Sequence, residues 1–414
     1  MFSPAEAFPA GPVRALALGT MFRTTGRGLF VTVSVLYLTR SVGLSVALVA
    51  SAMTVAAAAG LAAALPAGHL ADLRGPRNLT VVFAALEAVA IAGYCAVLTF
   101  TGLIVTAILV SVCETASLTG RSALIARSVP PQDRVRTRAR LRVITNIGWS
   151  VGAGVAGTVL LHESRPGYLA LICAAAACHL ASALVTLRIP SLPPLEVAGK
   201  ERGPRWVTLR DRPFLALTAL NGVLCLHDAI LNIAVPLWVV QYTRAPLSVV
   251  AWLFIVNTVI VVLLQVRLSR NTDTVRGAAR AQRRAGALLT LSCAVYAWSA
   301  NGSPSLAVVL LVVAAAVHAL GEIQQSAGAW GISYELADEA FVGQYQGLYG
   351  MGVSIAAIAA PTVITTLLVG AGQPGWFVLG GLFLLSGMVV PVLAERASRR
   401  RTRAGERDDQ VVQR

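Results

Sequence analysis

The stretch GHLADLRGPR, residues 68–77, separates two long apolar segments at 45–67 and 78–99. Each segment has the roughly 20 residues that a helix needs to cross a hydrocarbon core about 30 Å thick. The glycines in the stretch permit a tight reversal, and Asp72 can pair with basic neighbours or face a helix N-terminus. The stretch therefore predicts a short loop between two membrane-spanning helices.

The composition extends this prediction to nearly the whole chain. Of 414 residues, 56% are hydrophobic and only 13% are charged, whereas a soluble domain carries roughly 25% charged residues. We predict an all-α membrane protein with twelve transmembrane helices in two parallel six-helix halves. The expected spans are 13–38, 45–67, 78–99, 103–128, 138–161, 167–188, 213–240, 247–268, 284–300, 305–330, 341–369 and 375–396.

Four parts follow from this pattern. The first six-helix half is residues 1–188, and the second is residues 213–396. Between them, residues 189–212 are rich in proline and charge, which predicts a cytoplasmic linker. Residues 397–414 form a basic tail. The N-terminus has no basic region ahead of its first apolar stretch, so we interpret that stretch as a retained span rather than a signal peptide.

The net charge of +15 marks membrane topology rather than nucleic-acid binding. No basic helix or aromatic stacking platform accompanies the basic residues, and arginines instead crowd alternate connections between spans. By the positive-inside rule, those connections and both termini are cytoplasmic, in a multi-pass protein of the cell membrane. The arginine-rich connections contain Arg74 and Arg77, Arg134 to Arg140, Arg202 to Arg212, Arg270 to Arg284, and the tail from Arg396.

The 68–77 loop resembles the signature between the second and third helices of the major facilitator superfamily. The matching residues are Gly68, Leu70, Ala71, Asp72, Gly75 and Arg77, whereas Leu73 and Pro76 stand where the family usually has arginine. The resemblance implies that Asp72 engages the start of the eleventh helix, near Asp338 and Phe341. The counterpart in the second half, residues 265–277, lacks the expected aspartate, so any latch is expected to be asymmetric.

A second resemblance concerns function. The segments ALIARSVPPQDR (123–134) and NIGWSVGAGVAG (146–157) are similar to the fourth-to-fifth helix region of drug:proton antiporters in that superfamily. In those proteins a Gly-Pro pair is usual, but here Val155 follows Gly154. Small residues permit close helix packing in membranes. The candidate packing glycines of this helix are Gly148, Gly152, Gly154 and Gly157.

Several ionisable residues lie inside predicted spans, where a charge at the helix centre costs roughly 2.5–3.5 kcal/mol. They fall on spans one, four, seven and ten, which line the central cavity in the superfamily, whereas Glu87 in span three is expected to face helix packing or a loop. We expect Arg23 or Arg27 to pair with Glu114. In the second half we expect a titratable cluster of Asp228 and Glu322 with His227 or His318 nearby.

These groups are the candidates for proton coupling, with Asp228 first, Glu114 second and Glu322 third. Buried structural ion pairs remain the alternative interpretation. Asn221, Cys225, Asp228 and Asn232 follow each other at helical spacing and predict a polar stripe. Further candidates for lining a substrate cavity are Asn221, Asn232, Gln324, Gln325, Phe22, Phe30, Tyr37 and Trp330.

Together these observations predict a secondary active transporter, a monomer in the lipid bilayer that exports a small organic compound, such as a drug or secondary metabolite, by proton-coupled alternating access. The alternative is a proton-coupled importer of a nutrient. An intramembrane enzyme is a remote alternative, because no recognised catalytic motif accompanies the polar residues. Protons and a small molecule are the expected partners. No cofactor, metal or nucleic acid is expected.

Overall fold

The structure is a computed structural model that describes residues 11–161, 164–191 and 206–412. Within these ranges the chain is helical, with short turns and no strand. Twelve long helical segments follow one another, which confirms the predicted fold class. They are α2 (Pro12–Leu36), α3 (Val46–Arg74), α4 (Pro76–Gly93), α5 (Phe100–Ser128), α6 (Pro131–Leu160), α7 (Arg165–Thr186), α8 (Arg212–Cys225) with its continuation α9 (Val235–Tyr242), α10 (Val249–Leu268), α11 (Val275–Trp298), α12 (Pro304–Glu335), α13 (Val342–Thr365) and α14 (Gln373–Val412).

Short helical pieces complete the described chain. Three of them are π-helical: η1 (Tyr37–Ser41) extends α2, η4 (Ile230–Ala234) joins α8 to α9, and η6 (Thr366–Gly370) extends α13. The others are 3₁₀ turns, namely η2 (Tyr94–Ala96), η3 (Val207–Arg210) and η5 (Glu339–Phe341). Single π-helical turns inside α-helices are frequent at functional sites, which makes η4 of particular interest below.

Ten of the helical segments in the described chain are long and apolar enough to cross a membrane, judged by length and composition. The two long segments outside this set are α2 and α11. Arg23 and Arg27 lie in the middle of α2, and four arginines lie in the first half of α11. The charges lower the hydropathy of both helices, although each is long enough to span a bilayer.

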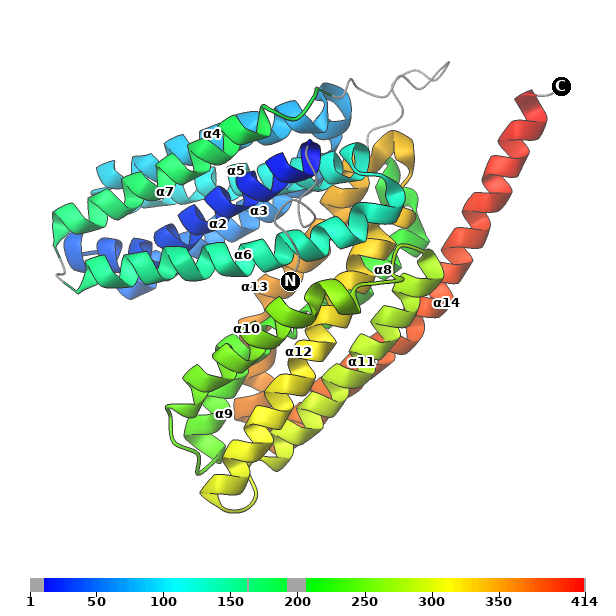
Figure 1. The fold of residues 1–414 in the computed structure, drawn as a ribbon. Helices are drawn as coiled ribbons and strands as arrows, with labels where there is room; N and C mark the ends of the chain where they lie inside the picture. Colours follow the sequence, from blue (N-terminus) through cyan, green and yellow to red (C-terminus); the bar gives the residue numbers. More distant parts are fainter. Residues whose placement is uncertain (1–10, 162–163, 192–205, 413–414) are drawn as a thin grey trace. The chain divides into compact units, whose positions relative to one another are not determined.

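The chain divides into two compact units. The first comprises Met1–Pro131, Arg140–Val207 and Asp338–Met351. Within it, α3 packs along α5, α2 along α7, and α4 against both α5 and α7, as the blue to green ribbons of Figure 1 show. Buried aromatic and aliphatic side chains fill the space between them, including Phe30, Tyr37, Tyr94 and Leu103.

The second unit comprises Gln132–Ala139, Thr208–Ala337 and Gly352–Arg414. Here α11 lies between α12 and α14, α10 packs on α12, and α8 packs on α14. Trp376 stacks on Tyr296 and meets Trp238 edge-on. Two helices are therefore divided between the units. The start of α13, up to Met351, belongs to the first unit and the rest of α13 to the second, whereas Gln132–Ala139 of α6 belong to the second unit and the rest of α6 to the first.

Polar caps explain where several helices begin. The side chains of Thr99, Ser164, Thr274 and Ser303 each accept a hydrogen bond from a backbone N–H in the first turn of the helix that follows. Such caps satisfy N–H groups that have no partner within the helix. The residues before each apolar run therefore fix the helix starts.

Several boundaries differ from the sequence prediction. Helix α6 begins at Pro131 and α11 at Val275, before the apolar runs at 138 and 284. Proline is favourable at the first position of a helix, as in α6, and the Thr274 side chain caps the first turn of α11. Helix α14 continues through the predicted tail to Val412. Most of the predicted linker, residues 192–205, lies outside the described residues.

The seventh span, predicted over 213–240, is present as Arg212–Tyr242, but its helix is interrupted in the middle. After Cys225 the backbone makes a turn with bonds between residues three apart, including His227 N–H to Leu224 O at 3.2 Å and Ile230 N–H to His227 O at 2.9 Å. The π-helical η4 follows before regular helix resumes. Hydropathy is continuous across this break, so hydropathy does not reveal it.

Candidate functional site

An ion-pair cluster lies inside the first unit. On α2, Arg27 Nη1 lies 2.8 Å from Glu114 Oε2, and Arg23 Nη2 lies 3.5 Å from Glu114 Oε1. Glu114 is on α5. We expected Arg23 or Arg27 to pair with Glu114, and in the structure both lie within 4.0 Å of it. Because 28% of Arg27 and 20% of Glu114 side-chain surface is exposed, this end of the cluster is accessible.

The other end of the cluster is fully buried. Arg23 Nη2 lies 3.6 Å from Glu87 Oε1 on α4, and the same oxygen lies 3.3 Å from His179 Nε2 on α7. Both carboxylate oxygens of Glu87 lack a hydrogen-bond partner among the described residues. Glu87 therefore lies in the helix packing, one of the two expected alternatives, but it does so as a member of the charge cluster.

His179 was not predicted as a site residue. Its position is fixed by its own Nδ1, which lies 2.9 Å from the Ala175 carbonyl oxygen, and by Gly26 on α2. A Cβ atom at Gly26 would come within 2.7 Å of His179 Nδ1, so the absence of a side chain there lets α7 approach. The available sequence signal was a lone histidine in an otherwise apolar span.

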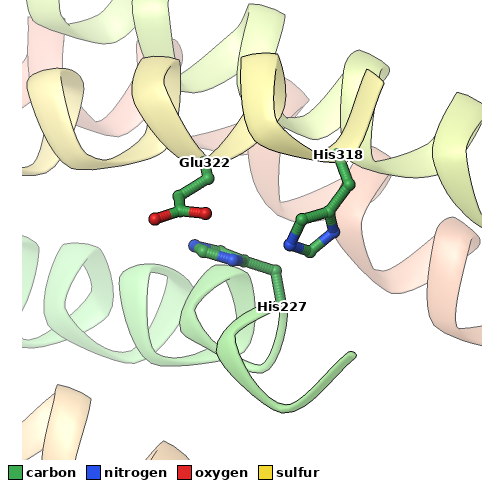
Figure 2. A group of neighbouring side chains, drawn as sticks. All are labelled: His227, His318 and Glu322. Atoms are coloured by element: carbon green, nitrogen blue, oxygen red, sulfur yellow. The ribbon is translucent and has the colours of Figure 1, made fainter. Parts of the chain in front are cut away.

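A second cluster lies inside the second unit. His227 follows the end of α8, and His318 and Glu322 are one turn apart on α12. The two imidazole rings are 5.4 Å apart between centroids and meet edge-on, as Figure 2 shows. Asn257 Nδ2 on α10 donates to Glu322 Oε2 at 3.1 Å. The predicted proximity of these two histidines and Glu322 is present.

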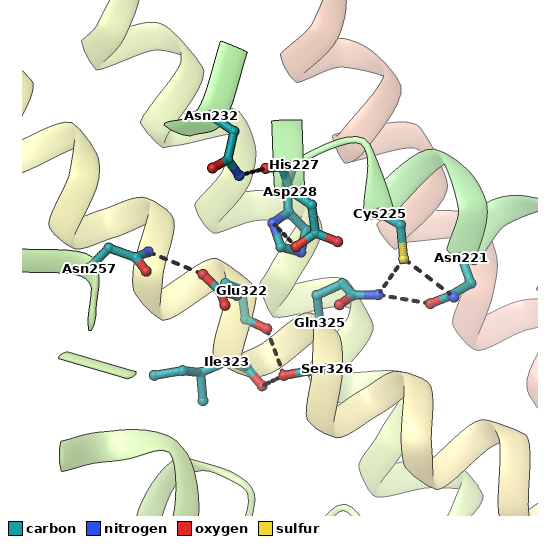
Figure 3. A network of polar contacts seen from close by, with 10 residues as sticks. All are labelled: Asn221, Cys225, His227, Asp228, Asn232, Asn257, Glu322, Ile323, Gln325 and Ser326. Carbon is teal, nitrogen blue, oxygen red and sulfur yellow. Dashed lines mark hydrogen bonds and ion pairs between the residues drawn. The ribbon is translucent and has the colours of Figure 1, made fainter. Parts of the chain in front are cut away.

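Asp228 is the exception in this cluster. His227 Nδ1 lies 3.8 Å from Asp228 Oδ1, but 58% of the Asp228 side chain is exposed. Asn232 is exposed too and donates to the Asp228 carbonyl oxygen at 2.8 Å, whereas Asn221 and Cys225 are buried. The predicted continuous polar stripe is therefore wrong, because the turn after Cys225 rotates the later residues away (Figure 3).

The buried part of the stripe belongs to an amide network. Gln325 Nε2 donates to Asn221 Oδ1 at 2.9 Å and to Cys225 Sγ at 3.4 Å (Figure 3). Gln282 Nε2 on α11 approaches the same Asn221 oxygen at 3.4 Å. Gln324 points elsewhere and donates to the Leu268 carbonyl oxygen at 3.3 Å. Three helices are thus joined by amide hydrogen bonds close to the histidine cluster.

The loop motif makes the contact that the resemblance implied. Asp72 Oδ1 accepts from the Gly343 N–H at 2.6 Å, and Oδ2 accepts from the Gln344 N–H at 3.0 Å. A carboxylate at this place satisfies N–H groups of the first turn of α13 and favours the positive end of the helix dipole. A Cβ at Gly68 would lie 2.9 Å from Gln344 Cα, so this glycine permits the close approach.

The remaining motif residues form the turn into α4. Leu70 is half-buried in the last turns of α3. Gly75 has φ of 86°, a left-handed conformation that favours glycine. Arg77 Nη2 donates to the Leu187 carbonyl oxygen at the end of α7, at 2.6 Å. The turn is therefore fixed at both ends.

A corresponding contact in the second unit was not predicted. The carboxyl group of Asp273, which lies between α10 and α11, is close to the backbone N–H of Val135 in the first turns of α6. Burial raises the pKa of Asp273 above its ordinary value, and the nearby Val135 N–H opposes this shift. The aspartate at the motif position is absent from residues 265–277, as expected, but Asp273 lies later in the same segment, beyond the end of α10, and faces the start of α6.

The sequence profile described as Major Facilitator Superfamily matches residues 16–361. This chain belongs to the Major Facilitator Superfamily. It is therefore a polytopic membrane transporter, as predicted from the loop motif. The family explains why the Asp72 contact and the twelve-segment fold occur together.

Individual superfamily members resemble this one along nearly their whole length. The chain is 24% identical over 394 residues to the uncharacterized MFS-type transporter YdeE of Escherichia coli K12, covering 92% of this chain and 95% of that protein. The human organic anion transporter MFSD10 has a similar structure, with a TM-score of 0.67 and 16% sequence identity. The match covers 94% of this chain and 100% of that one. A bacterial homologue of the iron transporter ferroportin, in its outward-facing state, also has a similar structure. Its TM-score is 0.71 and its sequence identity is 15%, and the match covers 94% of this chain and 99% of that one. At these identities the two structures show the shared fold alone.

The aromatic residues predicted for the transporter's substrate cavity lie in different environments. Phe30 is buried against Tyr94, with ring centroids 4.8 Å apart, and Tyr37 is buried and donates to the Cys95 carbonyl oxygen at 3.3 Å. Phe22 is exposed and Trp330 is half-buried. Phe30 and Tyr37 thus contribute to the core of the first unit in this structure.

The glycines of the fifth span separate into two groups. Added Cβ atoms at Gly148 and Gly152 would collide with Thr24 and with the Thr25 carbonyl oxygen of α2. Cβ atoms at Gly154 and Gly157 would meet nothing within 4 Å. Two of the four predicted packing glycines therefore permit the close approach of α6 and α2.

Proposed function

We propose that this transporter exports a small organic compound in exchange for protons, and that Glu114 takes up and releases the proton. The observation that carries this proposal is the contact of one carboxylate with two arginines inside apolar helices. Its oxygens lie 3.5 Å from Arg23 and 2.8 Å from Arg27. Since 20% of the Glu114 side chain is exposed, a proton can reach it without unfolding the helix bundle.

The energetic argument favours function over stability. Removing charges from water costs several kcal/mol per ion, and a buried ion pair is often no more stable than apolar residues of the same volume. The first unit nevertheless contains Arg23, Arg27, Glu87 and Glu114 in contact, with His179 beside Glu87. A buried charge cluster of this kind can serve a transporter, because the charge of a glutamate in it changes when a proton binds.

Exchange follows if proton and substrate compete for the same carboxylate. A proton on Glu114 cancels the charge that holds Arg27, which has no other acidic partner within 4.0 Å among the described residues. A substrate group that is cationic or donates hydrogen bonds would bind the ionised carboxylate and exclude the proton. Arg23 stays next to Glu87 in either state, so the change affects the accessible end of the cluster.

Import of a nutrient with a proton is the second candidate. If protonation of Glu114 releases Arg27, the free guanidinium can bind an anionic substrate group, and proton and substrate then travel in the same direction. The 28% exposed side chain of Arg27 supports this scheme. The human structural relative MFSD10 is an organic anion transporter, which is a substrate type that this scheme accommodates.

The experiment is transport by the purified protein in liposomes with an imposed pH gradient. A compound is first chosen by thermal stabilisation of the protein, because a ligand that binds the folded state raises its apparent stability. Antiport predicts accumulation of this compound in vesicles with an acidic interior. Symport predicts accumulation in vesicles with an acidic exterior.

The variant Glu114→Gln removes the carboxylate for which proton and substrate compete. We expect it to lose the response to the pH gradient, and we expect its binding of the compound, followed by thermal stabilisation, to be weaker and independent of pH. Glu395→Gln is the matched control, because Glu395 also pairs with an arginine but is exposed at the molecular surface, and it should transport like the wild type. A Glu114→Gln protein that follows the pH gradient as the wild type does would refute the proposal.

Glu114 takes precedence over Asp228, the first choice from sequence, for a geometric reason. Asp228 is 58% exposed and lies 3.8 Å from His227 Nδ1, so a change in the charge of Asp228 would alter few buried contacts. Asp228→Asn is tested in the same vesicles. Loss of coupling in that variant with coupling intact in Glu114→Gln would transfer the role to the second unit.

A further inference from the structure

Three ligand-type side chains converge in the second unit. One nitrogen of His227, one nitrogen of His318 and one carboxylate oxygen of Glu322 all lie within 4.8 Å of one another. Figure 2 shows the His227 ring between the Glu322 carboxylate and the His318 ring. The residues come from two spans, with His318 and Glu322 on the same face of α12.

The three side chains are also withdrawn from solvent. Exposed fractions are 2% for His227, 1% for His318 and 8% for Glu322. The Nδ1 atoms of both histidines are buried without a hydrogen-bond partner among the described residues. A buried polar atom without a partner costs about 1–3 kcal/mol, so two such atoms in one cluster indicate that something else binds there.

A divalent transition metal ion satisfies this arrangement. Two imidazole nitrogens and one carboxylate oxygen are a donor set typical of Zn²⁺ sites with one open position. Two rings 5.4 Å apart repel each other if both carry a proton charge, whereas one cation between them binds a lone pair from each. We propose that His227, His318 and Glu322 bind a divalent transition metal ion of the zinc type, independently of the exchange proposed at Glu114.

The required movement is small. Metal–ligand distances of about 2.0–2.2 Å in a tetrahedral site place ligand atoms about 3.3 Å apart. Starting from separations of at most 4.8 Å, each side chain moves by about 1 Å or less. Asn257, which donates to Glu322 at 3.1 Å, orients the carboxylate from outside, as hydrogen bonds to metal ligands commonly do.

The backbone supports the same site. His227 lies in the turn that interrupts the seventh span, between α8 and η4. A side chain in a regular helix is confined by the preceding turn, whereas this turn lets the imidazole reach α12. No metal site was expected from sequence, because the ligands come from segments that are far apart in the chain and this local break is invisible in the hydropathy.

The test measures metal binding to the full-length protein in detergent, purified without a histidine tag and stripped with a chelator. Co²⁺ is followed by its visible absorption and Zn²⁺ by calorimetry and by thermal stabilisation of the protein. We expect saturable binding of one ion per chain. His318→Gln and Glu322→Gln should each weaken it at least tenfold. His179→Gln, which changes an equally buried histidine beside a glutamate in the other unit, should leave it unchanged.

A further variant keeps the proposal testable if the glutamine variants unfold. His318→Cys retains a metal ligand, so it should still bind Co²⁺ and should add the thiolate-to-cobalt charge-transfer absorption that arises only from direct coordination. The proposal is overturned if the wild type shows no saturable binding, if folded His318→Gln binds as the wild type does, or if His179→Gln abolishes binding. Folded His318→Cys that binds Co²⁺ without the charge-transfer band also overturns it.

Discussion

Arg23 holds the central position in the first unit because it lies between two carboxylates. It is 3.6 Å from Glu87 and 3.5 Å from Glu114, and its side chain is only 9% exposed. One guanidinium cannot neutralise two carboxylates, so Arg27 supplies the second positive charge at the Glu114 end, whereas at the other end His179 Nε2 lies 3.3 Å from Glu87. The cluster is therefore a chain of alternating charges that runs from a buried to an accessible end.

The buried end should matter more for stability than the accessible end. Removing one partner of a buried ion pair typically costs about 3–5 kcal/mol, because the other charge is left without compensation. For Glu87→Gln we expect a loss near 3 kcal/mol, since Arg23 retains Glu114. Thermal unfolding of the purified protein should show a clearly lower midpoint. The exposed Glu395→Gln control should unfold at the wild-type temperature, and an unchanged midpoint for Glu87→Gln would contradict the charge-chain description.

Sequence reasoning found the accessible end of this cluster and missed its buried end. Arg23, Arg27 and Glu114 were identifiable because each is a lone charge in an apolar segment, and a charge there needs a partner. The contacts of Glu87 with Arg23 and His179 depend on how α4 and α7 pack against α2. No spacing rule within one helix contains that information.

At the scale of helices, close packing depends on which glycines face a neighbour. Gly152 of α6 lies where a Cβ would be 2.9 Å from the Leu29 nitrogen of α2, and closer still to the Thr25 carbonyl oxygen. Gly154, two residues later, faces open space. Sequence spacing identified α6 as a packing helix but could not tell its contact face from its free face, because four glycines in ten residues cover more than one face.

This difference gives a matched pair of variants in one helix. Gly152→Ala forces α6 and α2 apart and should cost about 1–3 kcal/mol, the usual range for overpacking. Gly154→Ala should be neutral or stabilising, because alanine favours helix over glycine by about 1 kcal/mol. Thermal unfolding in detergent compares the two. Equal effects of both variants would show that the contact between α6 and α2 does not limit stability.

In both halves of the chain, an aspartate at or after the end of the second helix lies at the start of a helix from the other half. Asp72, after the second helix of the first half, binds the start of α13. Asp273, after the second helix of the second half, lies close to the start of α6, near the Val135 N–H. In each case the partner is the fifth helix of the other half. The parallel repeat was predictable from six and six spans, but the second aspartate was not, because it lies beyond the helix end.

The arginine distribution gives the last prediction, which concerns the orientation of the whole chain. Arginines are concentrated in alternate connections, such as the stretch at 270–284 with Arg270, Arg276, Arg280, Arg283 and Arg284, whereas the connection at 243–248 has only Arg244. Because positively charged short loops are retained on the cytoplasmic side, alkaline phosphatase fused after Thr243 should be active outside the cytoplasm. The same enzyme fused after Asn271 should be inactive, and fluorescent protein at the C-terminus should fold and fluoresce in the cytoplasm. The reverse pattern would place both termini outside and invert the direction assigned to transport in vesicles of known orientation.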